Sequence, residues 1–220
     1  MDQLELLSKS KHVIEWSDEI PDKALIEKIL WNTWKVTRSK NSFMPYHVNV
    51  LGPDKTAEKT LIWEKTKVHD VLMNEKNTDY VHPATSNNKL FEQLASAPYT
   101  IVMSQRICEP NPLYKRHIEG GGYYEQMDND AINGQMCALI ETGMFYSNLT
   151  AFALEEGLDT SCILCFSINM KDWEDLDFVK ECPLLLVTIG KCKESRREWL
   201  NDIDSADDKK PEPNEIIRWI

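Results

Sequence analysis

Residues 131–156 form the longest stretch of this sequence that is compatible with a single helix. The stretch contains no proline, and its only glycines are Gly134 and Gly143. Its apolar residues fall on nearly every side of a helical projection, which is typical of a helix buried on most faces. Gly157 follows directly, and glycine is common just beyond a helix end. We therefore predict a central helix that lies in a domain core or at a subunit interface.

Shorter patterns on either side predict a mixture of helices and strands. Helices are expected over Pro21–Trp34, Ala57–Met73, 86–97 and the acidic segment 172–181, and strands over Tyr46–Leu51, 99–107, 161–168 and 184–190. These elements do not alternate strictly as strand, helix, strand. They predict an α+β fold with one mainly antiparallel or mixed sheet flanked by helices. No repeat or linker divides the chain, so residues 1–220 are expected to form one domain.

Composition and charge argue against several classes of protein. The chain has a net charge of −11 over 220 residues, which disfavours nucleic acid and anionic membranes as partners. No apolar run approaches the roughly 18 residues of a membrane-spanning helix. The start, MDQLELLSKSK, lacks the apolar core of a secretory signal, so a cytoplasmic location is expected. Basic residues still cluster at Lys9–His12, 191–197 and Lys209–Lys210. Such clusters are either part of a solvated surface or the binding site of a small anion such as a phosphate.

The only C-x-x-C motif comprises Cys162 and Cys165, and it admits three interpretations: a metal site, a redox dithiol or a plain apolar strand. A zinc site needs a second pair of ligands, and no histidine or cysteine pair supplies it at a recognised spacing. Redox dithiols usually begin a helix, whereas these cysteines lie in an apolar run and would face opposite sides of a strand. No known catalytic motif is present either, so no metal is expected and redox chemistry would require a bound cofactor.

Four segments, taken in order, resemble one family. They are SKHVIEWSDEIPDKALIEKIL from Ser10, TRSKNSFMPYHVNVL from Thr37, LASAPYTIVMSQR from Leu94, and EEGLDTSCILCF from Glu155, the last followed by CPLLLVTIGK. Their order and spacing are similar to those of the nitroreductase family, whose members are FMN-dependent α+β proteins that form intertwined dimers. The resemblance covers nearly the whole chain and marks it as a divergent member.

The resemblance implies an FMN held at the interface of a homodimer, with no catalytic side chain because the flavin carries the chemistry. The stretch Ser10, Lys11 and His12 would grip the phosphate and ribityl chain, and Ser39, Asn41 and Ser42 would come from the partner subunit. The segment Cys162, Ile163, Leu164 and Cys165 would contact the flavin ring, with a backbone N–H near N5, and Lys209 and Lys210 would close over the phosphate. Ile14, Arg38, Lys40, Met44 and Leu164 depart from the family pattern.

The activity that the resemblance implies is transfer of hydride from NAD(P)H through the flavin to a nitroaromatic, a quinone or a similar flat acceptor. A segment over about 111–127, which contains Tyr123 and Tyr124, would form a mobile lid or an exposed loop. Two alternatives stay open: a flavin- or ligand-binding protein without turnover, and a flavin-fragmenting or dehalogenating relative.

Overall fold

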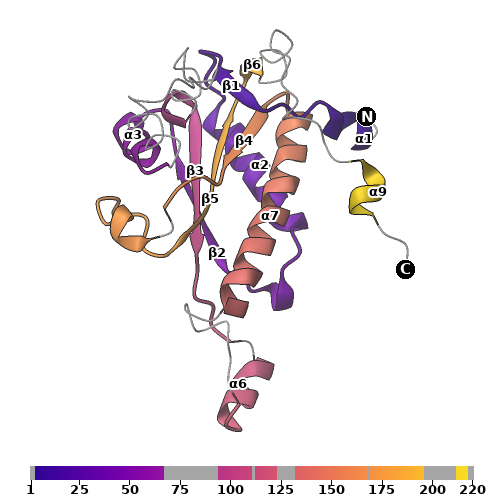
Figure 1. Ribbon diagram of the computed structural model, residues 1–220, viewed down its shortest axis with the longest axis vertical. Helices are drawn as coiled ribbons and strands as arrows, with labels where there is room; N and C mark the ends of the chain where they lie inside the picture. The colour runs from indigo at the N-terminus through magenta and orange to yellow at the C-terminus, as the bar shows by residue number, and fades with distance from the viewer. Residues whose placement is uncertain are drawn as a thin grey trace.

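The centre of the molecule is a four-stranded sheet in the order β2-β3-β5-β4 (Figure 1). The computed structural model describes residues 3–66, 94–110, 112–122, 132–167, 169–195 and 212–217. Each neighbouring pair of strands is antiparallel, and a separate antiparallel pair joins β1 to β6. The strands are β1 Val13–Trp16, β2 Tyr46–Leu51, β3 Tyr99–Gln105, β4 Asp159–Ile163, β5 Pro183–Gly190 and β6 Cys192–Ser195. The predicted α+β fold with an antiparallel sheet is confirmed.

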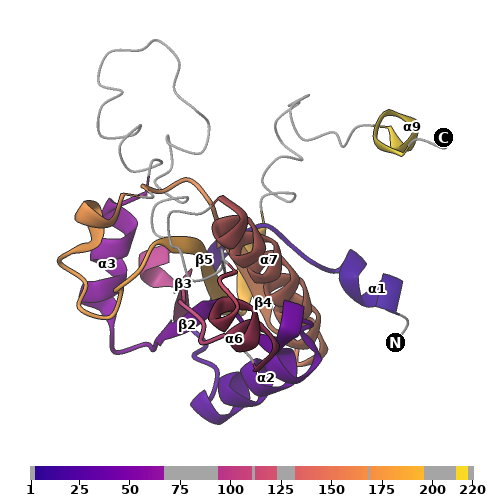
Figure 2. The same ribbon diagram turned by 90° about the horizontal axis from the view of Figure 1, so that it is seen from below.

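Helices cover both faces of the sheet (Figures 1 and 2). α2 and α7 lie together on one face, α3 lies on the other, and α6 extends beyond the end of the sheet at which β2 begins. The described helices are α1 Gln3–Ser8, α2 Lys23–Val36, α3 Thr56–Glu64, α6 Pro112–Glu119, α7 Ile132–Glu155 and α9 Pro213–Ile216, with 3-10 turns η1 Lys40–Ser42 and η3 Met170–Trp173. Within the described residues, no helix is both long and apolar enough to cross a membrane.

The alternation of side chains along the central strands creates two cores. Ile101 and Met103 of β3 point to the face that α2 and α7 cover, where they join Ile29 and Phe145. Val102 points the other way, into a core that also contains Ile62, Leu94 and Trp173. Successive strand residues face opposite sides of a sheet, so two layers of helix are needed to bury β3 and β5 completely.

Two sequence predictions near the candidate site are wrong in extent. The strand predicted over 161–168 ends at Ile163, because only residues up to that position pair with β5. The helix predicted over 172–181 is absent except for the 3-10 turn η3. There, single turns close at Leu176 N to Trp173 O (3.0 Å) and Val179 N to Leu176 O (2.9 Å). The three apolar residues of these turns are all buried. Most of the helix predicted over 86–97, and residues 67–73 of the one predicted from Ala57, lie outside the described residues.

Gly157 ends α7 in a conformation that few other residues adopt. Its φ is +74°, and the N–H groups of Gly157 and Leu158 donate back to Leu154 O (3.1 Å) and Ala153 O (2.8 Å). This pair of bonds satisfies carbonyls that the helix end would leave unpaired. The turn delivers the chain directly into β4, and so into the C-x-x-C motif.

Replacing Gly157 with alanine is expected to lower the free energy of unfolding by about 1–2 kcal/mol, the cost of a left-handed conformation for an L-residue. No atom lies within 4 Å of the added Cβ, so the cost comes from the backbone alone. Gly143→Ala in the middle of α7 is the matched control. It also meets no atom within 4 Å, but its backbone is helical, so it should stabilise by about 0.5–1 kcal/mol. Urea unfolding measures both, and equal effects of the two substitutions would contradict this account.

Candidate functional site

The segment Ser39–Met44, called the 39–44 loop below, joins α2 to β2 in a strained conformation. Ser42 and Met44 have φ values of 58° and 50°, in the left-handed region that non-glycine residues rarely occupy. Internal bonds close the loop: Ser39 Oγ accepts from Met44 N at 2.8 Å, and Phe43 N donates to Lys40 O at 3.2 Å. The loop carries Ser39, Asn41 and Ser42 of the predicted site.

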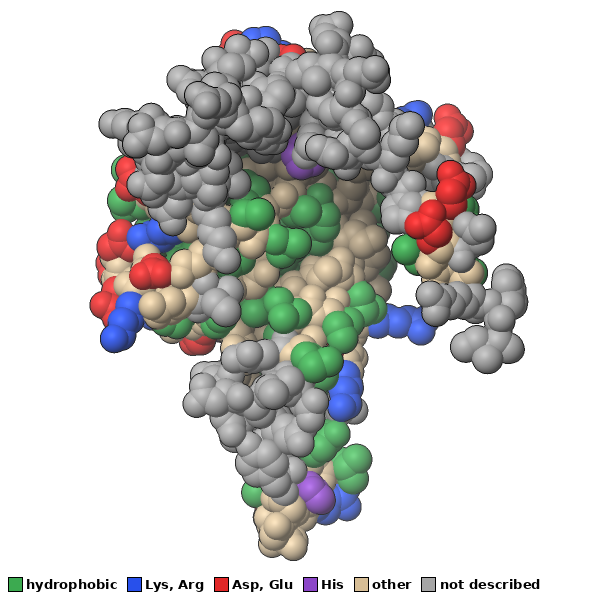
Figure 3. Space-filling model, viewed as in Figure 1, with side chains coloured by type: hydrophobic (Ala, Val, Ile, Leu, Met, Phe, Trp, Pro, Cys, Tyr) green, Lys and Arg blue, Asp and Glu red, His purple; other side chains and the backbone are tan. Residues whose placement is uncertain are grey.

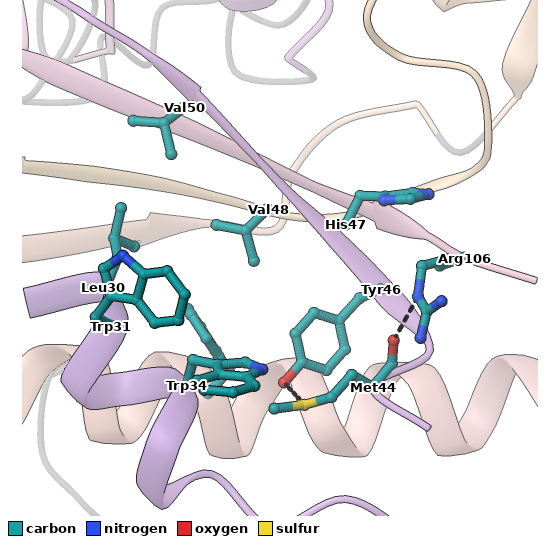
Figure 4. A pocket seen from close by; sticks show the side chains of 10 residues that line it. Leu30, Trp31, Trp34, Met44, Tyr46, His47, Val48, Val50 and Arg106 are labelled. Atoms are coloured by element: carbon teal, nitrogen blue, oxygen red, sulfur yellow. Dashed lines mark hydrogen bonds between the residues drawn. The ribbon is translucent and has the colours of Figure 1, made fainter. Parts of the chain in front are cut away.

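Two charged side chains from other elements hold this loop. Glu141 of α7, only 5% exposed, accepts a hydrogen bond from Lys40 N at 2.9 Å. Arg106, which follows β3, donates from Nε to Met44 O at 2.9 Å and from Nη2 to Phe43 O. Figure 4 shows the Arg106 side chain directed at the Met44 carbonyl. The loop is therefore fixed to the central helix on one side and to the sheet on the other.

Titratable groups around the loop are shifted by burial. Burial, and secondarily the charge of Glu141, raises the pKa of the Tyr46 phenol, whose hydroxyl lies 3.0 Å from Met44 Sδ. Burial also raises the pKa of the Cys108 thiol. That cysteine packs with Phe43 and Tyr114, so α6 is attached to the loop through this small cluster. Neither group is poised to ionise near neutral pH.

An apolar pocket of about 570 Å³ lies beside the loop, between α2 and the edge strand β2 (Figure 4). Its lining is mostly aromatic and aliphatic: Leu30, Trp31, Trp34, Met44, Tyr46, His47, Val48, Val50, Arg106 and Phe145. The rings of Trp31 and Trp34 meet edge to face with centroids 5.3 Å apart. Both tryptophans are more than half exposed, so this surface offers apolar area to a ligand or a partner.

The second part of the predicted site is the turn Leu164–Cys165, which directly follows β4. Leu164 is 68% exposed, and Cys165 is exposed as well. The chain is anchored on both sides of the turn, by β4–β5 pairing before it and by the bridge between Phe166 and Thr66 after it. Among the described residues, the Cys165 N–H has no hydrogen-bond partner. The turn thus presents a backbone donor and an apolar side chain on a rigid base.

The other two residues of the motif point into the protein. Cys162 is half-buried and contacts Tyr146 of α7, while Ile163 packs into the core on the opposite face. Burial, then the charge of Cys162, raises the pKa of Tyr146 to about 12. The prediction that Cys162 and Cys165 face opposite sides of one strand is wrong, because β4 ends at Ile163 and Cys165 lies beyond it. All six cysteines are free.

The third part, Ser10, Lys11 and His12, lies between α1 and β1, and all three residues are exposed. Neighbouring Lys9 is paired with Glu5 at 3.6 Å, whereas Lys11 has no ion pair with any described residue. Lys11 is therefore the cation here that an anionic ligand would meet most easily. The Asn41 side chain, Lys209 and Lys210 lie outside the described residues.

Within one chain, the Ser10–His12 stretch and the 39–44 loop lie near different ends of α7. α1 packs beside the C-terminal end of α7 (Figure 1). The 39–44 loop is hydrogen-bonded to Glu141, which lies in the N-terminal half of α7. The sequence-based assignment of the loop to the partner subunit's site fits this separation and stays a prediction. Sequence reasoning missed Glu141 and Arg106, although an acid within the apolar run ALIETGMF was an available signal.

Comparison with solved structures identifies the class of fold. A nitroreductase family protein from Streptococcus pneumoniae TIGR4 matches with a TM-score of 0.63 and 20% identity over 100% of both chains. A protein from Exiguobacterium sibiricum 255-15, assigned as a nitroreductase and solved in complex with FMN, gives 0.64 and 16%, covering 100% of this chain and 98% of its own. A Staphylococcus epidermidis protein assigned as an NAD(P)H:FMN oxidoreductase gives 0.63 and 16%, covering 100% and 96%.

This chain therefore has the nitroreductase fold, as the sequence resemblance predicted. No protein-family model matches the sequence, and no curated protein matches it.

Proposed function

We propose that the protein is an FMN-dependent oxidoreductase, which uses NAD(P)H to reduce a nitroaromatic, a quinone or a similar flat acceptor. One observation carries the proposal. On a fold shared with an FMN complex, the exposed Leu164–Cys165 turn has an apolar side chain beside a backbone N–H that no described residue accepts a hydrogen bond from. A flat heteroaromatic ring needs both an apolar surface and a hydrogen-bond donor at its edge.

The residues present fit FMN in their chemistry. Ser10, Lys11 and His12 are exposed donors of the kind that bind a phosphate dianion through charge-assisted hydrogen bonds. Bound FMN would supply the hydride-transfer chemistry, which explains why the chain shows no catalytic motif. The chain itself would hold the phosphate, orient the ring through Cys165 N–H, and keep water from it with apolar side chains. No side-chain acid or base is required.

A second function, flavin or ligand binding without turnover, is favoured by the small positive charge at the phosphate end. Lys9 is already paired with Glu5, and Ile14 stands where the family usually has a cation. Retention of the cofactor would then depend on Lys11 and on Lys209 and Lys210. Under this alternative, FMN would bind but neither nicotinamide nucleotide would reduce it.

We further propose that the active form is a homodimer. The lid over 111–127 and the cytoplasmic location stay predictions. α7 exposes four apolar side chains at helical spacing, Met136, Leu139, Ile140 and Met144, each at least 40% exposed. Figure 3 shows hydrophobic side chains gathered on the face of the molecule along which α7 runs in Figure 1. Ile216 and Ile217 at the C-terminal end are 70% and 59% exposed. Contiguous apolar surface of this kind is typical of an interface.

The experiment adds NADH or NADPH to the FMN-loaded protein in the absence of oxygen. We expect the flavin absorbance to bleach and to return when a quinone or nitroaromatic is supplied. Cys165→Ala should bleach at a similar rate, because the turn contributes a backbone N–H and not the thiol. Sedimentation of the same sample should show a dimer. If the protein binds FMN but neither NADH nor NADPH reduces it, the oxidoreductase function is excluded and flavin binding without turnover is supported.

A further inference from the structure

The strain in the 39–44 loop requires an external cause. Two non-glycine residues of this loop, Ser42 and Met44, have φ values of 58° and 50°. Each such residue costs free energy, and it persists only where its surroundings over-determine the backbone. Bonds within the loop close it, and side chains from α7 and from the residue after β3 contact it from outside.

Glu141 is an unusual residue for that position. It is 5% exposed on α7, and its carboxylate Oε1 accepts a hydrogen bond from the Lys40 N–H. Oε2 is buried and has no hydrogen-bond partner among the described residues. A buried acid that is only half satisfied costs stability relative to an apolar residue of similar size. Stability alone therefore does not account for a glutamate here.

Arg106 acts on the opposite side of the same loop. Two different side-chain nitrogens of Arg106 donate to the carbonyls of Phe43 and Met44, and the backbone N–H of Arg106 donates to Pro45 O at 3.0 Å. The guanidinium is a planar fork, so two simultaneous contacts fix the direction of both carbonyls. Met44 is one of the two strained residues. Glu141 and Arg106 thus hold the two ends of the loop from α7 and from the sheet.

We propose that Glu141 and Arg106 are positioning residues, which hold the 39–44 loop in its strained, cofactor-binding conformation before the cofactor arrives. The inference rests on the proposed function, in which this loop serves the flavin site of a partner subunit. A loop that is already ordered loses less conformational freedom on binding, so affinity rises without any new contact to the ligand. Removing either anchor should therefore weaken FMN binding although neither side chain needs to touch FMN.

The test compares Glu141→Ala and Glu141→Gln with Glu155→Ala, which removes an exposed acid from the same helix. Hydrogen exchange of the Lys40 amide reports the loop without any ligand. Glu141→Ala should exchange at least about tenfold faster at that amide and should bind FMN about tenfold more weakly. Glu141→Gln keeps an oxygen that can accept the same bond and should restore both values. Glu155→Ala should change neither.

Arg106→Lys provides the second arm, because it keeps the charge and removes the fork. It should behave like Glu141→Ala, with faster exchange in the loop and weaker FMN binding at unchanged unfolding free energy. If Glu141→Ala does not fold, Arg106→Lys decides the question. Unchanged exchange in Arg106→Lys, and in Glu141→Ala where that variant folds, would overturn the proposal, as would faster exchange with unchanged FMN affinity. If the wild-type protein binds no FMN, the proposed function and the positioning role fail, while the exchange data still show whether the two residues hold the loop.

Discussion

Replacing Trp173 with alanine is expected to lower the free energy of unfolding by about 3–5 kcal/mol, the largest effect of any single substitution considered for this chain. The Trp173 side chain is fully buried. Its indole N–H donates to Ser167 O at 2.8 Å, and its ring meets Phe166 edge to face with centroids 5.8 Å apart. Alanine would leave a cavity and an unpaired carbonyl at the same point.

Trp31→Ala is the matched control, because Trp31 is 59% exposed. It should change stability by no more than about 0.5 kcal/mol in urea unfolding. Trp173→Phe should fall between the two, since it keeps most of the packing and loses the hydrogen bond. A Trp173→Ala protein as stable as Trp31→Ala would show that the 166–179 segment is not part of the core. Trp173→Ala should also loosen the Leu164–Cys165 turn, because Trp173 packs against Phe166, and Phe166 anchors that turn.

Replacing Lys11 with alanine is expected to raise the dissociation constant for FMN by about 10–100-fold, the range for loss of one hydrogen bond to a charged group. Lys11 is the cation of the N-terminal cluster that has no ion pair with a described residue. Lys9→Ala is the control, because Lys9 is paired with Glu5 at 3.6 Å. It should change FMN affinity little. Fluorescence titration of the apoprotein measures all three proteins.

Riboflavin separates a phosphate effect from a general one, because it lacks the phosphate. Lys11→Ala should bind riboflavin as the wild type does. Equal losses for FMN and riboflavin would mean that the substitution disturbs the protein rather than the phosphate contact. No loss for either ligand would remove Ser10, Lys11 and His12 from the site and would move the phosphate to Lys209 and Lys210.

Local patterns predicted much of the fold. β2 has the predicted bounds Tyr46–Leu51, and β3 begins at Tyr99 directly after the Ala97-Pro98 turn, as expected. α7 spans Ile132–Glu155 within the predicted 131–156. These elements are specified by residues close to one another in the chain: apolar periodicity in the strands, and Gly157 at the end of the helix. Such signals need no knowledge of the tertiary fold.

The predictions that were wrong depended on contacts between distant residues. The segment 172–181 has a helix-like composition, but Trp173, Leu176 and Val179 are buried through successive turns against the sheet. Pairing with β5 decides where β4 ends. The hydrogen bonds that hold the 39–44 loop join residues far apart in the chain: Lys40 and Glu141 are separated by 101 positions, and Met44 and Arg106 by 62. No local pattern in the sequence predicts such pairs. The positive φ values could not be predicted either, because they occur at Ser42 and Met44 and not at glycine.

The C-x-x-C motif shows the same division. Its apolar neighbours predicted a strand with the two cysteines on opposite faces, and they gave no sign that the strand stops between the cysteines. In the structure Cys162 contacts α7, whereas Cys165 is exposed in the turn beyond β4. The proposed role of the turn rests on this end of the strand.

The most direct test of the central claim is equilibrium binding of FMN to the purified protein. The claim is that the Leu164–Cys165 turn and the Ser10–His12 stretch belong to a flavin site. The account predicts a yellow protein, or an apoprotein that takes up one FMN per chain and binds it more tightly than riboflavin. A colourless protein that does not bind added FMN, although it is folded and dimeric, would contradict it.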